Sequence, residues 1–163
     1  MTRNPRPKPG RERRGAALRL SSGEARRRFG TARVAVLATT GLATAAGPGP
    51  PHLVPVTFAL DGDRLCTVVD SKPKASRDLR RLANIRADPR VSLLADHYDE
   101  DWPLLWWARA DGQAEILARP ADMAGPIALL ARRYPQYTAE PPAGPVISIA
   151  VARWSGWAAA GGT

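Results

Sequence analysis

The stretch His52-Leu-Val-Pro-Val-Thr-Phe58 is followed, after one tight turn and a second strand-like run, by Ser71-Lys-Pro-Lys-Ala-Ser76 and the helical pattern of residues 77–87. This order predicts a strand, a turn, a second strand and then a basic loop that leads into a helix. Lysine side chains and the free N–H groups at a helix start favour binding of an anion, most often a phosphate. The candidate anion-binding residues are Lys72, Lys74, Ser76 and Arg77.

The residues around this stretch predict an antiparallel sheet. Within 53–60, alternate residues from Val54 to Leu60 fall on one apolar face, and Pro55 marks a sheet edge or a bulge because proline has no N–H to donate. Asp61-Gly62-Asp63 predicts a hairpin turn. Further strands are expected at residues 33–39, 64–69, 90–96 and 146–151, with a hairpin that pairs 103–110 with 113–118 around Asp111-Gly112, whereas 41–51 is expected to be a loop.

Helical patterns occupy three segments, at residues 22–29, 77–87 and 121–134. The first opens with the capping sequence Ser21-Ser-Gly-Glu24, and Gly30 is placed to end it. About six strands joined mainly by short turns, with helices inserted between them, predict a mainly β protein of the small-barrel type. A parallel dinucleotide-binding sheet is disfavoured, since no Gly-x-Gly-x-x-Gly follows a predicted strand.

The positive charge is concentrated at the N-terminus. The chain of 163 residues has a formal net charge of +9, and residues 1–28, with ten basic and two acidic residues, carry +8 of it. We expect a disordered basic tail at 1–20, one folded domain at 21–158 and a flexible end at 159–163. Because the predicted domain is nearly neutral, its composition weighs against nucleic-acid binding, which remains a hypothesis for the tail alone.

Cysteine content and hydropathy bear on the compartment. The single cysteine, Cys66, cannot form an internal disulfide and lies in an apolar pattern that predicts burial. No apolar run reaches the roughly 20 residues of a membrane span, and no apolar segment of the signal-peptide type follows the basic tail. These features predict a cytoplasmic protein with no membrane partner.

The sequence lacks the common motifs of catalysis by protein side chains. It contains no Gly-x-Ser-x-Gly and no Walker sequence. Its two histidines, His52 and His97, and its one cysteine exclude a zinc site rich in either residue, and the acidic run 97–101 predicts a solvated loop without the spacing of a calcium site. No residue is therefore predicted to be catalytic, and an enzyme with this sequence would carry its reactive atom on a cofactor.

Two adjacent tryptophans stand out among the five in the chain. Trp106 and Trp107 lie in a predicted strand, so their side chains face opposite sides. We expect one of them in the core and the other presented outward, at an interface or as a wall on which a ring stacks.

Several segments carry a family resemblance when taken in order: Pro51-His-Leu-Val-Pro-Val-Thr-Phe58, Asp70-Ser-Lys-Pro-Lys74, residues 80–94, Asp96-His-Tyr-Asp99, Leu105-Trp-Trp107 and Arg153-Trp-Ser-Gly-Trp157. Over about residues 22–158 the chain resembles the pyridoxamine-5′-phosphate-oxidase-like split-barrel superfamily, and more narrowly the coenzyme F-420-dependent oxidoreductases of its PPOX class. The resemblance implies a six-stranded antiparallel split β-barrel. It also implies a homodimer with two cofactor sites at the dimer interface.

The same resemblance implies roles for particular residues. Lys74, with Lys72 beside it, would hold the cofactor phosphate; His52, Pro55, Val56 and Thr57 would line the cofactor ring; and Trp106, Arg109 and Trp154 would reach the partner's site. Ser76 and Arg77 are added by the physical argument for an anion site at a helix start. Many relatives carry a polar residue in place of Pro55 and a Thr or Ser in place of Ala75, so tight FMN binding is not expected.

The implied activity is hydride transfer between coenzyme F-420, a deazaflavin, and a small unsaturated substrate, with FMN as the alternative cofactor. A protein of this kind binds, orients and excludes water rather than supplying a nucleophile. A second hypothesis is a non-catalytic carrier of F-420, FMN or haem, which would bind the cofactor without turnover. A third, based on the basic tail, is a nucleic-acid-associated module whose binding depends steeply on salt.

Overall fold

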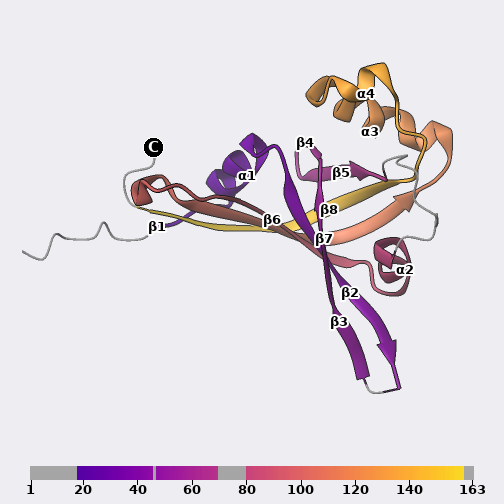
Figure 1. Ribbon diagram of the computed structural model, residues 1–163, viewed down its shortest axis with the longest axis horizontal. Coiled ribbons are helices and arrows are strands. Elements are labelled where there is room, and N and C mark those ends of the chain that lie inside the picture. Colours follow the sequence, from indigo (N-terminus) through magenta and orange to yellow (C-terminus); the bar gives the residue numbers. More distant parts are fainter. Residues whose placement is uncertain (1–17, 46, 70–79, 160–163) are drawn as a thin grey trace, which may run out of the picture.

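The computed structural model describes residues 18–45, 47–69 and 80–159, which form one antiparallel sheet of eight strands with helices packed against it (Figure 1). The strands are β1 (Leu18–Arg19), β2 (Ala35–Thr44), β3 (Gly47–Val56), β4 (Ala59–Asp61), β5 (Arg64–Val68), β6 (Arg90–His97), β7 (Trp106–Leu117) and β8 (Val146–Ala158). The helices are α1 (Ser22–Thr31), α2 (Arg80–Ala87), the 3-10 helix η1 (Trp102–Leu104), α3 (Pro120–Arg133) and α4 (Gln136–Ala139). None of the described helices is long and apolar enough to cross a membrane.

The predicted fold class is confirmed in its mainly antiparallel β character, but the predicted count of six strands is wrong. The strand order is β3-β2-β6-β7-β8-β5-β4, with β1 paired to β8, so the described sheet is open at β3 and β4. The segment 53–60 is not one strand, because it breaks at Thr57-Phe58 between β3 and β4. Residues 18–19, which the sequence places in the tail, form β1.

Most of the segment 41–51, predicted as a loop, belongs to a hairpin. It extends β2 to Thr44 and begins β3 at Gly47. Glycine and proline are poor strand formers, but a Cβ at Gly41 or Gly49 would lie closer than 3.0 Å to the opposite backbone. The glycines therefore let the two strands approach closely. The predicted edge position of Pro55 is confirmed, since among the described strands β3 pairs only with β2.

Asp111-Gly112, predicted as a hairpin turn, lies in the middle of β7 instead. β7 pairs with β8 on both sides of this dipeptide, and the register shifts there so that Ala152 of β8 is the extra residue of a bulge. A Cβ at Gly112 would lie closer than 3.0 Å to the carbonyl oxygen of Ala150. Gly112 thus permits the close approach of two strands and does not reverse the chain.

The α1 helix begins as the sequence predicts. The Ser21 side-chain oxygen accepts a hydrogen bond from the N–H of Glu24 at 3.2 Å. Glu24 also pairs with Arg27 at 2.6 Å and with Arg28 at 2.8 Å, and the hydrogen bond from Arg28 is the main cause of the lowered pKa of its carboxyl group. The predicted stop at Gly30 is wrong, because the helix continues through it to its last residue, Thr31.

The main hydrophobic core lies between the sheet and helices α1 and α2, on what we call the inner face of the sheet. Phe29 of α1 is fully buried, and its ring centroid lies 4.9 Å from that of Phe58 and 5.4 Å from that of Trp154. Helix α2 contributes Leu82 and Ile85 to the same cluster. The predicted alternation in β6 is confirmed, since its core-facing residues are Val91, Leu93 and Ala95.

Helices α3 and α4 cover a second, smaller core over β4, β5 and β8. Leu130 and Tyr134 are buried there as predicted, together with Cys66, whose burial raises the pKa of its thiol to about 11. The Tyr134 hydroxyl accepts the N–H of Phe58 at 3.2 Å and donates to the carbonyl oxygen of Arg33 at 2.8 Å. This hydroxyl therefore ties α3 to the segments that enter β2 and β4.

The helices leave one part of the sheet free. Figure 1 shows α1, α3 and α4 on one side of the long strands β6, β7 and β8, with the β2–β3 hairpin projecting away from these three helices. Helix α2 packs beside β2 and β7. The candidate site is therefore sought along the hairpin and on the exposed side of the long strands.

Candidate functional site

The predicted anion-binding residues Lys72, Lys74, Ser76 and Arg77 lie outside the described residues. The described chain reaches Val69, just after β5, and continues at Arg80, the first described residue of α2. The other predicted site residues belong to β3, β7 and β8 or follow β3 directly. Their surroundings define the candidate site.

The four residues predicted to line a cofactor ring do not share one surface. His52 and Val56 face the inner side of β3, and Pro55 faces the opposite, outer side. Val56 is buried in the main core. Thr57 follows the end of β3, and its hydroxyl lies 2.9 Å from that of Tyr137 in α4. The inner and outer members of this set therefore belong to two different surfaces.

The three residues predicted to reach a partner's site are also divided. Trp106 is half-buried on the inner side of β7, where its ring stacks on that of His97 at a centroid distance of 6.4 Å. Trp154 is 8% exposed, and its indole N–H donates to the Asp63 carboxylate at 2.8 Å. Arg109 lies on the outer side of β7, and its side chain is 40% exposed.

A row of side chains crosses five strands on the outer side of the sheet. Directly opposite residues in antiparallel strands point to the same side. The pairings in the sheet therefore align, from β3 through β2, β6 and β7 to β8, Pro55, Val36, Leu94, Arg109 and Ser155. This row brings two predicted site residues, Pro55 and Arg109, onto one surface.

The next row on the same side is more polar and consists of Leu53, Ala38, Ser92, Asp111 and Arg153. The Asp111 carboxylate accepts a hydrogen bond from the Ser92 hydroxyl at 2.7 Å and pairs with Nη2 of Arg109 at 3.0 Å and with Nε of Arg153 at 4.0 Å. Sequence reasoning missed Asp111 because Asp-Gly predicts a turn. Counting the alternation of β7 through Gly112 would have placed Asp111 beside Arg109.

These two rows, with Trp107 and Trp157 beside them, form a surface that we call the outer sheet face. No described helix covers it, and its large apolar side chains are accessible, with exposed fractions of 60% for Leu53, 39% for Leu94 and 36% for Trp107. The prediction that one of the adjacent tryptophans packs on the core while the other points outward is confirmed. An apolar surface with ion pairs at its centre suits a flat ring or a second protein surface.

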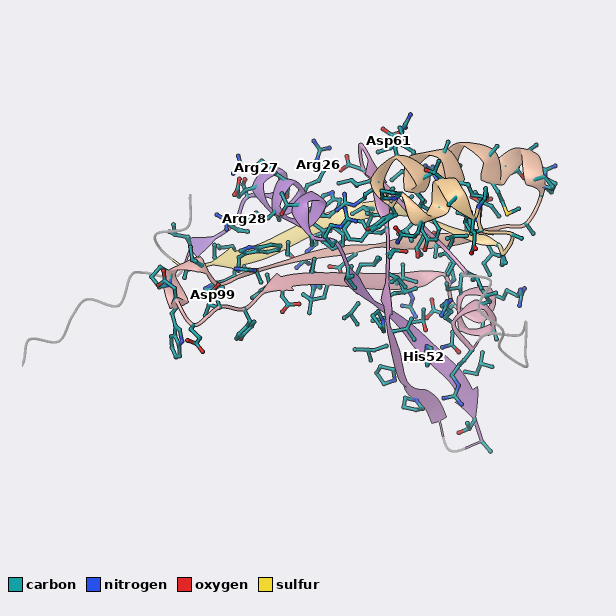
Figure 2. The ribbon with its side chains drawn as sticks, turned by 45° about the horizontal axis from the view of Figure 1, so that its top comes forward. Arg26, Arg27, Arg28, His52, Asp61 and Asp99 are labelled. Carbon is teal, nitrogen blue, oxygen red and sulfur yellow. The ribbon has the colours of Figure 1, made fainter. Side chains whose placement is uncertain are left out.

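Polar side chains on the inner face meet between β2, β3 and α2. Asn84 of α2 is fully buried, and its Nδ2 donates to Oγ1 of Thr39 at 2.9 Å. Thr39 lies directly opposite His52, whose carbonyl oxygen accepts from the Thr39 hydroxyl at 3.5 Å. Oδ1 of Asn84 and Nδ1 of His52 are buried with no hydrogen-bond partner among the described residues. Figure 2 shows His52 on the projecting hairpin, away from the arginines of α1.

A surface pocket of about 460 Å³ lies where α1 joins β2. Its lining includes Arg33, Asp96, His97 and Trp106. Residues 98–101 are exposed as predicted, but His97, which the sequence places in the same loop, is the last residue of β6. The described residues contain no group of His, Cys, Asp and Glu side chains arranged to hold a metal ion.

Comparison with known proteins gives both a family and a fold. A family model described as pyridoxamine 5′-phosphate oxidase matches residues 22–158. A FAD-binding protein from Mesorhizobium loti is 21% identical with a TM-score of 0.65, over 88% of this chain and 98% of its own. The FAD-binding protein from Mycobacterium smegmatis is 14% identical with a TM-score of 0.55, and the match covers 85% of this chain and 94% of that protein. A heme-binding protein from Mycobacterium smegmatis is 23% identical with a TM-score of 0.62, and the match covers 89% of this chain and 56% of that protein. No curated protein matches the chain.

Proposed function

Since the chain belongs to the pyridoxamine 5′-phosphate oxidase family, we propose that it binds a flavin-type cofactor and acts as an oxidoreductase. The observation that carries this proposal is the family match, which runs from the first residue of α1 to the last residue of β8. Proteins of similar fold that bind FAD or heme support the proposal that this fold is used here to bind a cofactor.

Coenzyme F-420 is the proposed cofactor, FMN is the alternative, and a small unsaturated molecule is the proposed substrate. The choice of F-420 rests on the resemblance of residues 80–94 to the deazaflavin-dependent branch and on Pro55 and Ala75, which lack the polar groups found in many FMN-binding relatives. When bound, the cofactor supplies the chemistry of hydride transfer.

The described residues fit a cofactor of this kind. A flavin-type ring is flat and largely apolar, with polar atoms along its edge. The outer sheet face offers an apolar wall beside the Arg109–Asp111 pair. Lys72 and Lys74 remain the proposed phosphate ligands, because a lysine ammonium forms strong charge-assisted hydrogen bonds with phosphate.

The chain's own residues would bind, orient and shield the reacting groups. An exposed apolar side chain such as Leu53 excludes water from a ring laid against it. Two hydrogen bonds from Arg109 to Asp111 hold its guanidinium in one orientation, which lowers the entropy cost of contact with a ligand. The thiol of Cys66 is buried, with a pKa raised to about 11, and is unsuited to act as a nucleophile.

A homodimer joined through the outer sheet face is part of the same proposal. Exposed apolar patches of this kind mark interaction surfaces. In a two-fold symmetric dimer the same patch meets itself, so the face must complement its own charges. Asp111, flanked by Arg109 and Arg153, provides both signs of charge within one network.

Leu94→Glu is expected to weaken the dimer by at least about tenfold in dissociation constant, or about 1.4 kcal/mol. The substitution would bury a charged carboxylate in the interface, where it would compete with Asp111 for the guanidinium of Arg109 directly opposite. Light scattering after gel filtration measures the molar mass of the protein in solution and so distinguishes dimer from monomer. Ala128→Glu, an exposed position on α3, is the matched control and should leave the mass unchanged. A wild-type monomer, or a dimer indifferent to Leu94→Glu, would contradict this arrangement.

Equilibrium titration of the full-length chain with F-420 and with FMN, followed by cofactor fluorescence, tests the proposed function. Binding of F-420 at roughly micromolar affinity, and tighter than FMN, is the expected result. A preference for FMN would assign the protein to the flavin branch instead. Binding of neither would overturn the proposal. Cofactor binding without turnover of any substrate in a panel of unsaturated molecules would favour the non-catalytic carrier. Titration with haem then tests haem as the carried cofactor.

Lys74→Ala is expected to weaken cofactor binding by about 1.5–3 kcal/mol, the usual value of a hydrogen bond to a charged group. The same titration measures the change. Lys8→Ala removes an equal charge from the basic N-terminal segment and serves as the control. Equal affinities of Lys74→Ala and wild type would remove Lys74 from the site.

A further inference from the structure

The connection between β6 and β7 presents large apolar side chains to solvent. It comprises residues 98–105, which we call the β6–β7 tip. The exposed fractions are 82% for Tyr98, 67% for Trp102 and 43% for Leu104. A single exposed aromatic side chain is common in proteins, but several within one short connection indicate an interaction surface.

The same tip is acidic. Asp99, Glu100 and Asp101 are exposed, and the tip contains no lysine or arginine. Within the described part of the chain, the only ion pair of these carboxylates joins Oδ2 of Asp99 to Nε2 of His97 at 3.6 Å. A surface that combines carboxylates with aromatic rings suits arginine, because a guanidinium pairs with carboxylates and also stacks on aromatic faces. The chemistry of the tip therefore favours a partner segment rich in arginine.

The chain itself contains such a segment at its N-terminus. Residues 1–17, which lie outside the described residues, contain five arginines and one lysine against one glutamate. Arg11, Arg13 and Arg14 come within seven residues of Leu18, the first described residue. The charge of this segment is thus complementary to that of the β6–β7 tip.

Strand β1 brings the end of this segment close to the tip. Leu18 pairs with Ala158 of β8, which in turn pairs with Trp106 of β7. Neighbouring strands are about 4.8 Å apart, so Leu18 lies roughly 10 Å from the residue that follows the tip. Just past β8, Ala159 donates its N–H to the carbonyl oxygen of Leu105 at 2.9 Å. Figure 1 shows β1 at the same end of the long strands as the connection between β6 and β7.

We propose that the basic segment 1–17 docks on the β6–β7 tip of its own chain, with its arginines against the carboxylates and aromatic rings of the tip. Seven residues of unstructured chain span on the order of 15 Å, so Arg11, Arg13 and Arg14 are all within reach of the tip. Such a tether holds the segment at an effective concentration in the millimolar range, which favours it over a separate protein of the same charge. The proposal concerns a different surface from the proposed function and does not depend on it.

Paramagnetic relaxation in the full-length protein tests this docking. A nitroxide attached to a Gly10→Cys variant marks the segment, and the indole N–H signals of nitrogen-15-labelled tryptophan report its proximity. Cys66 is buried, so the label attaches to the introduced thiol. We expect the signal of Trp102, assigned with Trp102→Phe, to be broadened more than that of Trp154, which pairs with Ala110 farther along the sheet.

Neutralising the tip should release the segment. The triple variant Asp99→Asn, Glu100→Gln and Asp101→Asn removes three exposed charges and nearly keeps the side-chain shapes. Because ion pairs between exposed groups are individually weak, losing three of them should remove at least about half of the broadening at Trp102. Salt at about 1 M, which shortens the screening length to about 3 Å, should have the same effect on the chain with an unaltered tip.

The matched control is Asp61→Asn, Glu115→Gln and Glu140→Gln, which removes the same charge from exposed positions elsewhere and should leave the broadening unchanged. Equal broadening of Trp102 in the two triple variants would overturn the proposal, as would broadening of Trp102 no greater than that of Trp154 with the tip unaltered. Dilution of the doubly labelled protein with unlabelled chain separates the two possible partners. Broadening that disappears on dilution would place the segment on a second copy and would overturn docking on its own chain.

Discussion

Gly112→Ala is expected to lower the free energy of unfolding by about 3 kcal/mol or more, enough to leave much of a marginally stable domain unfolded. The new Cβ would lie closer than 3.0 Å to the carbonyl oxygen of Ala150 and 3.0 Å from its carbonyl carbon. Both are backbone atoms in a paired strand, so the clash cannot be relieved by turning a side chain. The clash is relieved only if β7 and β8 separate at the bulge, and this separation breaks the backbone hydrogen bonds between the two longest strands of the sheet.

Urea or thermal unfolding followed by circular dichroism measures this loss. Gly23→Ala in the first turn of α1 is the matched control, because no atom outside its immediate neighbours lies within 4 Å of the added Cβ. Alanine is the better helix former by up to about 1 kcal/mol, so the control should be neutral or slightly stabilising. Equal stabilities of the two variants would show that the strands at the bulge are not in close contact.

Phe58→Ala is expected to cost about 3–5 kcal/mol, the usual range for removing a fully buried aromatic ring. Phe58 fills the break between β3 and β4, where its ring contacts that of Phe29 and lies 4.8 Å from the guanidinium of Arg133. The same unfolding measurement applies. Tyr98→Ala, at a position with an exposed fraction of 82%, should change stability by less than about 0.5 kcal/mol. A small loss in Phe58→Ala would mean that the core collapses into the space left by the ring.

Local patterns of the sequence predict the parts of this fold that depend on nearby residues. The cap formed by Ser21 and Glu24 and the hairpin turn at Gly62 are decided within a few residues, and both are found. The wrong predictions at Gly41, Gly49 and Gly112 share one cause. Each glycine allows its strand to approach a neighbouring strand closely, and a single sequence does not distinguish that use of glycine from a turn.

The candidate site follows the same division. Alternation along β3 already separates Pro55 from His52, so that part of the geometry was accessible from the sequence. The pair Arg109–Asp111 was accessible in the same way, but the turn expected at Asp111-Gly112 concealed it. The contact of Asn84 with Thr39 was not accessible, because it exists only where α2 packs against β2. Such a contact depends on tertiary packing, for which the residues alone carry no local signal.

The position of β8 in the sheet has a consequence for how the chain acquires its structure. In the strand order, β8 stands between the group β3-β2-β6-β7 and the group β5-β4, and it is the last of the described strands in sequence. During synthesis β7 and β5 therefore keep one unpaired edge each until β8 is synthesised and pairs with both of them. Its pairing with β5 spans about 80 residues of chain, a separation that slows folding and prolongs the exposure of aggregation-prone edges. Chaperone demand in the cell should accordingly be greatest for nascent chains that end before residue 146.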